Sequence, residues 1–236
     1  MSEWKAKRFW KEVSFCQEDD GFAVALDARR VKTPAKRPLV VPTEAFAQAI
    51  ADEWDAQEEK VDPLSMPFTR SANAAIDKVA QQHTEVAEML AAYGDSDLLC
   101  YRAEHPKVLV TRQAEQWDPV LDWAETTLGA RLNARSGVMH VPQEPDALAV
   151  LSHQVHEMSA FQLAGFHDLV SLSGSLILGL AATHDLKSPK ALWDISRLDE
   201  IWQAEEWGQD DDAEAAAKIK ERAFFHAKQV FDLSGG

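Results

Sequence analysis

The chain has 236 residues, of which 46% are hydrophobic and 27% charged, and its formal net charge is −15 at pH 7. This composition is that of a folded globular protein, and it excludes a disordered or fibrous chain. The negative charge argues against a nucleic-acid binder or a protein held on anionic membranes, because both partners are polyanions that select basic surfaces.

Cysteine use and hydropathy indicate the compartment. The two cysteines, Cys16 and Cys100, show no CxxC spacing, so neither a disulfide framework nor a cysteine zinc site is expected. The amino terminus lacks the order of a secretory signal, and the most apolar stretch, residues 169–182, is interrupted by serines and shorter than the ~18 residues of a membrane span. We therefore expect a cytoplasmic protein without an integral membrane span, and a buried core helix at 169–182.

The first forty residues are predicted to form a small antiparallel sheet. Turn residues at 19–21 separate two β-prone runs, and Pro34 and Pro38 make the last part an edge or a bent connection. Residues 1–41 carry a net charge of +3, so the remainder carries −18. Strands are expected at residues 13–15, 22–26, 31–33 and 39–41.

A helix is predicted directly after these strands. Thr43 is a suitable N-cap, and Phe46, Ile50 and Trp54 recur every four residues on one face. Two prolines within residues 61–67 then stop the helical pattern. We place a domain boundary there, between a β-rich N-terminal domain, residues 1–62, and an all-α C-terminal domain, residues 63–236.

The C-terminal domain is predicted to be helical throughout. The predicted fold class is therefore α+β, with a small antiparallel β-rich domain followed by a larger all-α domain. Breaks are expected at 94–95, 129, 135–145, 165, 188–189 and 208. The helices are expected at about 68–92, 106–128, 146–164, 168–183, 189–206 and 211–231.

Motifs for catalysis are weak. His153 and His156 share a helix face and could join His167 in a metal site, but no HExxH pattern accompanies them, and hydrogen-bonded helix histidines are the better interpretation. The serines within 171–175 lack a G-x-S-x-G elbow, and no glycine-rich phosphate loop occurs. We expect no catalytic residue, no metal and no cofactor.

Tryptophan is the unusual residue of this sequence, with eight copies. Trp202 and Trp207 lie among acidic residues near a glycine break. Amphipathic tryptophan beside a polar rim is typical of partner-binding surfaces, although tryptophan at helical spacing is more often in the core. The pattern leaves both roles open for these two residues.

Several stretches together resemble the family of ATP synthase catalytic-head (F₁) assembly chaperones that attend the alpha subunit. Their order and spacing carry the resemblance, which extends over nearly the whole chain. The motif residues to which we give a structural role are Trp10, Trp54, Gly94, Asp95 and Asp97. The matching stretches are residues 8–11, 26–27, 31–34, 51–57, 73–77, 93–102, 116–119, 196–200 and 206–208.

The resemblance implies an activity without catalysis, in which the unassembled alpha subunit is held and kept from aggregating until the beta subunit takes its place. It also implies a β-rich domain followed by a helical one. The family's functional acidic residue after Ser-Arg-Leu falls on Asp199, where glutamate is the commoner residue, so Glu200 could share its role. Trp54, in the family's Glu-Trp-x-x-Gln motif, is expected to serve fold integrity.

We hypothesise that the last two helices provide the surface that receives the alpha subunit. The chain begins close to its Arg-Phe-Trp motif, whereas mitochondrial members begin with a transit peptide, so the resemblance implies the bacterial cytoplasm. A monomer is expected. The alternatives are a metal-dependent hydrolase using His153, His156 and His167, and a regulatory adapter of an assembled complex. The predicted partner-binding residues are Asp199, Glu200, Trp202, Glu205, Glu206 and Trp207.

Overall fold

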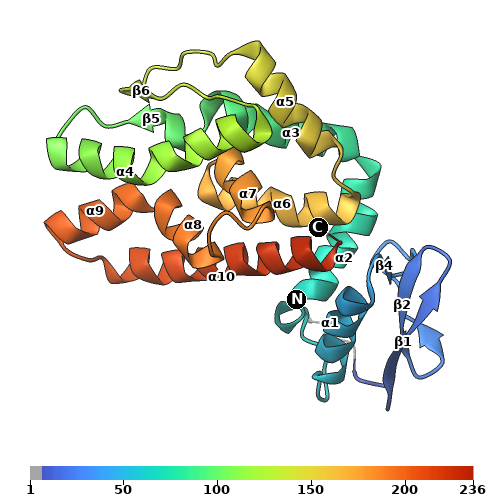
Figure 1. Cartoon of the computed structure of the whole chain (residues 1–236). Coiled ribbons are helices and arrows are strands. Elements are labelled where there is room, and N and C mark those ends of the chain that lie inside the picture. Colours follow the sequence, from blue (N-terminus) through green and yellow to red (C-terminus); the bar gives the residue numbers. More distant parts are fainter. Residues whose placement is uncertain (1–6, 236) are drawn as a thin grey trace. The chain divides into compact units, whose positions relative to one another are not determined.

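The structure, a computed structural model, describes residues 7–235 and divides into two compact units (Figure 1). The first unit runs from the start of the described chain to His83 and also contains Ser159–Gly165 and the residues from Gln229 onward. The second unit contains Thr84–Met158 and Phe166–Lys228. The boundary expected between residues 62 and 63 therefore falls inside the first unit.

The sheet of the first unit is antiparallel, as predicted, and so confirms the α+β class. Strands β1 (Val13–Glu18) and β2 (Gly21–Leu26) form a hairpin in which Val13 is paired with Leu26, and β3 (Arg29–Arg30) and β4 (Val40–Val41) both pair with β2. Gly21 has φ +145°, and a Cβ atom there would lie 2.3 Å from the carbonyl oxygen of Val41. Only glycine therefore fits at this turn.

Helix α1 covers this sheet and begins as predicted, because Thr43 Oγ1 accepts a hydrogen bond from the Phe46 amide at 3.2 Å. Phe46 and Ile50 are fully buried in the core of this unit. The rings of Phe46 and Phe68 lie 6.4 Å apart, so α2 packs on the same core, and for this reason no boundary occurs at residue 62. The helical segments here are α1 (Glu44–Asp55), η1 (Pro63–Ser65), α2 (Pro67–Asp77) and η2 (Val79–Gln81).

The second unit is helical, with one short parallel pairing of β5 (Tyr101–Arg102) with β6 (Arg135–Ser136). Helices α6 and α10 each continue from one unit into the other. The short helical turns of the second unit are η3 (Ala92–Ser96), η4 (Leu98–Cys100) and η5 (Ala124–Leu128). The longer helices are α3 (His83–Ala91), α4 (Lys107–Trp123), α5 (Pro145–His156), α6 (Ala160–Ser173), α7 (Leu176–Thr183), α8 (Pro189–Ser196), α9 (Leu198–Trp207) and α10 (Asp211–Leu233).

Several predicted helix boundaries were wrong. The segment 68–92 is divided into α2, η2 and α3, and the segment 189–206 is divided at Arg197 into α8 and α9. Gly165 lies inside α6, and the break comes earlier, because Ser159 and Gln162 form a reciprocal capping pair that starts α6.

The apolar stretch 169–182 is largely buried, as predicted, but it belongs to two helices instead of one. Gly174 has φ +70° and ends α6, and Ser175 caps α7 by accepting from the Leu178 amide at 2.9 Å. The two helices cross closely at Gly179, where a Cβ atom would lie 2.7 Å from Val170 Cγ2. Glycine is therefore required at this crossing for space.

We expect Gly179→Ala to lower the free energy of unfolding by about 1–3 kcal/mol, because the added methyl group overpacks a fully buried contact. The better helix propensity of alanine, worth ~1 kcal/mol, works in the opposite direction. Denaturant unfolding measures the difference. Val170→Ala combined with Gly179→Ala should cost less than the sum of the single changes, and an increase in stability from Gly179→Ala alone would contradict the crossing.

Candidate functional site

The end of α9 and the start of α10 form a hairpin in which no side chain is fully buried. Gly208, at φ +96°, ends α9, and Asp210 Oδ1 starts α10 by accepting from the amides of Asp212 at 2.9 Å and Ala213 at 3.1 Å. No side chain from residue 203 to residue 223 is buried, and Trp207 is 74% exposed. An exposed tryptophan among acidic side chains is typical of a partner-binding surface, so the hairpin is a candidate contact surface.

A groove of about 710 Å³ lies between α8, α9 and α10, and we call it the α9–α10 groove. Its volume is within the range of roughly 300–1,000 Å³ that is usual for ligand sites. Its apolar lining residues are Trp193, Ile201, Ala204, Trp207, Ala213 and Ala217. Its charged lining residues are Lys190, Asp194, Arg197, Glu200, Glu205, Asp210 and Glu214.

The electrostatic character of the groove is negative. Residues 199–214 contain eight acidic side chains and no basic one. Both basic lining residues have acidic partners, since Lys190 lies 2.5 Å from Asp194 and Arg197 lies 2.6 Å from Glu200. The groove can therefore attract a cationic group more readily than an anionic one.

The predicted partner-binding residues take three different positions. Glu200, Glu205 and Trp207 line the groove. Glu206 is exposed but does not line it, and Trp202 is only 8% exposed, with its ring 5.5 Å from that of Trp207. The buried Trp202 ring therefore packs against the exposed indole of Trp207.

Asp199 and Glu205 form hydrogen bonds with side chains of α4. The Asp199 carboxylate accepts from Gln113 Nε2 at 2.8 Å, and both terminal nitrogens of Arg112 donate to Glu205. The hydrogen bond from Arg112 holds the pKa of Glu205 below its usual range. The sequence analysis missed Arg112 and Gln113, because they lie in a helix between the recognised motifs and no local pattern points to them.

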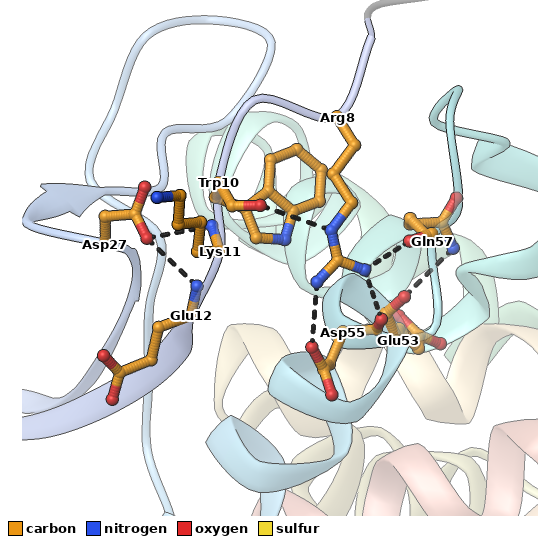
Figure 2. A network of polar contacts seen from close by, with 8 residues as sticks. All are labelled: Arg8, Trp10, Lys11, Glu12, Asp27, Glu53, Asp55 and Gln57. Atoms are coloured by element: carbon orange, nitrogen blue, oxygen red, sulfur yellow. Dashed lines mark hydrogen bonds and ion pairs between the residues drawn. The ribbon is translucent and has the colours of Figure 1, made fainter.

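Two of the recognised motifs meet in the first unit (Figure 2). Arg8 donates to the backbone carbonyl of Asp55 at 2.7 Å, to its carboxylate at 3.1 Å and to the carbonyl of Gln57. The rings of Trp10 and Trp54 lie 5.3 Å apart in an edge-to-face contact, with Trp10 buried and Trp54 half-buried. Both tryptophans are thus placed where they hold the start of the described chain on α1.

The motif at residues 51–57 also fixes the start of α2. Glu53 accepts from the amides of Phe68 at 2.6 Å and Thr69 at 2.7 Å, at the positive end of the helix dipole. Burial raises the pKa of Glu53, while these two hydrogen bonds lower it. The buried Gln57 side chain donates to the Glu53 carbonyl and accepts from the Asp62 amide. The motif therefore acts on the fold of the first unit.

We expect Arg8→Lys to lower the free energy of unfolding by about 1–3 kcal/mol, because lysine cannot reproduce the planar fork that reaches several acceptors. Arg30→Lys is the matched control, since Arg30 is exposed and forms one ion pair with Glu18 at 2.9 Å. Chemical unfolding of both variants measures the effects. Equal effects of the two substitutions would show that the Arg8 network does not stabilise the fold.

The motif around residues 93–102 joins elements of the second unit. A Cβ atom on the buried Gly94 would lie 3.1 Å from Leu148 and 3.2 Å from Leu176. Asp95 accepts from the Gln143 amide at 2.7 Å and lies 3.2 Å from His140 Nε2. These contacts fix the loop before α5.

Asp97 is fully buried in the second unit. Its carboxylate accepts from Ser175 Oγ at 2.7 Å and from the amides of Leu99 and Ile177, both at 3.0 Å. Burial raises the pKa of Asp97 to about 6, against the lowering effect of these donors. Ser175, once considered with the candidate nucleophiles, is therefore a capping residue that also binds Asp97.

Two of the three histidines considered for a metal site have other partners, and the third, His153, is exposed. His156 Nδ1 lies 2.8 Å from the Ser152 carbonyl, and His167 Nδ1 lies 2.8 Å from Asp168, which raises the pKa of His167. Within residues 7–235, no three His, Cys, Asp or Glu side chains are grouped closely enough to hold a metal ion. In the same part of the chain, no helix has both the length and the apolar character needed to cross a membrane.

Comparison with known proteins gives consistent results. The family model described as ATP12 chaperone protein matches residues 7–125, which is half of the chain. The mitochondrial protein atp12 of Schizosaccharomyces pombe is 26% identical over 220 residues, covering 88% of this chain and 75% of that protein.

Solved structures agree over the whole fold. The crystal structure of Atp12 from Paracoccus denitrificans is 50% identical, has a TM-score of 0.96 and covers 98% of this chain and 100% of that one. A point mutant of the P. denitrificans protein has the same TM-score at 49% identity, covering 99% and 100% of the two chains. A crystal structure from Agrobacterium tumefaciens is 42% identical with a TM-score of 0.87, covering 95% and 85%. The chain therefore belongs to the ATP12 chaperone protein family, whose members are chaperones of ATP synthase assembly and not enzymes.

Proposed function

We propose that this protein binds the unassembled alpha subunit of ATP synthase and prevents its aggregation until the beta subunit associates. Family membership supports a chaperone role in ATP synthase assembly. The observation that carries the proposal of a contact surface is the hairpin of α9 and α10, which has no buried side chain from residue 203 to residue 223 and exposes Trp207.

The surface combines an aromatic contact with acidic residues around it. A large aromatic side chain at the centre of a contact supplies much of its affinity, whereas charges at the rim mainly speed the encounter and set its register. Glu200 and Glu206 are exposed and can act in this way, whereas Glu205 is bonded to Arg112. A contact of this kind suits a chaperone, because moderate affinity allows the partner to leave when a better interface is offered.

Asp199 is better suited to hold α9 than to touch the partner directly, because it is half-buried and hydrogen-bonded to Gln113. Glu200 is exposed and lines the groove, so we assign to Glu200 the direct acidic contact. We also propose that the protein acts as a monomer in the bacterial cytoplasm, which is consistent with its likeness to proteins of P. denitrificans and A. tumefaciens.

Light scattering of the isolated alpha subunit, with and without an equimolar amount of this protein, tests the proposal. We expect the protein to suppress aggregation, and Glu200→Ala combined with Glu206→Ala to weaken the suppression. Glu58→Ala combined with Glu59→Ala removes the same charge from exposed positions of the first unit and is the matched control. Aggregation that continues unchanged with the unsubstituted protein would refute the chaperone role.

A further inference from the structure

We propose that the α9–α10 groove binds a short, basic, amphipathic helix of the alpha subunit. This inference rests on the proposed function and adds to it the class of partner segment and the place where it binds. Four features of the groove support it: its uncovered walls, its lack of a strand edge, its charge and its exposed tryptophan.

The walls of the groove are exposed, and their small side chains would allow another helix to pack closely against them. Ala204 of α9 and Ala213 and Ala217 of α10 line it, and none of them is buried. Small side chains on facing helices permit another helix to approach closely, since the interaxial distance depends on the side chains at the contact. A hairpin whose inner side is left open in this way is suited to receive a third helix.

The secondary structure of the groove favours a helix over an extended segment. Every lining residue belongs to α8, α9, α10 or the short connections between them. An extended segment usually binds by adding a strand to a free sheet edge, and no strand lines this groove. The incoming segment must therefore satisfy its own backbone hydrogen bonds, which a helix does.

The charge of the groove selects a basic segment. Five acidic and two basic side chains line the groove. Arg112 and Lys218, which do not line it, pair with the lining residues Glu205 and Glu214. The remaining negative charge comes from Asp210 and from the neighbouring exposed residues Asp211 and Asp212. Lysine or arginine on the incoming helix would complement this excess of carboxylates, and acidic segments would be repelled.

Trp207 supplies an apolar anchor. Its indole lines the groove, is 74% exposed and is supported by the buried Trp202. A rigid aromatic ring that is already positioned loses little conformational freedom when it covers an apolar side chain. The apolar face of the helix would therefore lie on the alanines and be covered at one end by Trp207.

A second copy of this chain is the competing occupant. Helix α10 carries Ile219, 68% exposed, between Lys218 and Lys220, and so offers a basic segment with an apolar side chain. If the purified protein sediments as a dimer at micromolar concentration and a substitution inside the groove dissociates it, the groove is occupied by a second copy and the proposal is overturned.

The experiment uses overlapping 20-residue fluorescein-labelled peptides covering the alpha subunit of the same organism, with binding measured by anisotropy. We expect the peptides that bind to be basic, to gain helix on binding, and to bind about tenfold more weakly when the salt concentration is raised from low to well above physiological values. Binding only by acidic peptides, or by peptides that stay non-helical, would overturn the proposal.

Two tryptophan substitutions on α10 provide the matched comparison. Ala217→Trp fills the groove, whereas Ala216→Trp adds the same bulk at a neighbouring exposed position that does not line it. We expect Ala217→Trp to weaken peptide binding at least tenfold and Ala216→Trp to leave it within about twofold. Equal effects would overturn the groove as the binding place.

Binding of the intact alpha subunit, measured beside the peptides, separates this inference from the proposed function. If the intact subunit binds the unsubstituted protein and Ala217→Trp does not weaken that binding, the groove proposal is wrong and the chaperone role stands. If the intact subunit does not bind at all, both are wrong. Circular dichroism of the two variants confirms that they are folded.

Discussion

Trp207→Ala is expected to weaken binding of the alpha subunit about 30-fold or more, the effect of losing an aromatic hot spot worth about 2 kcal/mol. Trp207 is largely exposed, lines the α9–α10 groove and is positioned by Trp202. Because so little of its side chain is buried, its removal should leave the free energy of unfolding nearly unchanged. Titration calorimetry of the alpha subunit with each variant, together with denaturant unfolding, measures both quantities.

The control for Trp207 is Ile219→Ala on α10. Ile219 is also a large exposed apolar residue, 68% exposed, but it does not line the groove. We expect its replacement to change binding by less than about twofold. An equal loss of affinity from the two substitutions would mean that general surface hydrophobicity, and not the groove, determines binding.

Asp97→Ala is expected to lower the free energy of unfolding by about 3–5 kcal/mol, the largest stability effect that we predict, because each of three donors left without an acceptor costs about 1–3 kcal/mol and removal of the buried charge offsets part of that sum. The substitution leaves the amides of Leu99 and Ile177 and the hydroxyl of Ser175 without their buried acceptor. It also removes the contact that joins η4 to the start of α7. Urea unfolding at neutral pH measures the loss, and a loss below about 1 kcal/mol would contradict this role of Asp97.

The hydrogen bonds of Asp97 stabilise the folded protein, whereas its buried negative charge destabilises it. The effect of the charge can be measured from the pH dependence of the free energy of unfolding. Burial raises the pKa of Asp97 from the ordinary 3.8 to about 6, so the folded protein binds this proton more tightly than the unfolded chain. The resulting contribution to stability is fully present below pH ~4 and is lost as pH rises through 6, a change of about 3 kcal/mol.

Asp97→Asn removes this titration. The asparagine amide group itself destabilises the protein, because its N–H donors face buried N–H groups, but this destabilisation does not depend on pH. We therefore expect the stability of the unsubstituted protein relative to Asp97→Asn to fall by up to about 3 kcal/mol between pH 4 and pH 7. Parallel urea titrations of the two proteins across this range give the difference. A difference that stays constant would mean that Asp97 has no raised pKa.

The parts of the fold that could be predicted depend on short-range signals. Thr43 as a cap and the spacing of Phe46 and Ile50 located α1, and the turn before β2 located the hairpin. The start of α6 had an equally local signal, the Ser159–Gln162 pair, which the glycine at 165 obscured. The division at Arg197 is harder to predict, because the Ser196 hydroxyl bonds to the Trp193 carbonyl and competes with regular helix geometry.

The candidate site was predicted only in part. Which of its residues are exposed depends on which face of each helix packs against the core. Trp202 and Trp207 have similar acidic neighbours in the sequence, yet one is buried and the other exposed. Asp199 and Glu200 are adjacent, yet Asp199 is bonded to Gln113 and Glu200 lines the groove. The bond from Gln113 on α4 distinguishes Asp199 from Glu200, and no local sequence pattern records such a tertiary contact.

Capture of the tagged protein from its native cells, with the bound polypeptides identified by mass, tests the central claim most directly. We predict recovery of the ATP synthase alpha subunit without the beta subunit, because a chaperone of the free subunit should leave when the two associate. Recovery of the complete ATP synthase would contradict that claim and indicate an adapter of the assembled enzyme, and recovery of neither would contradict it as well.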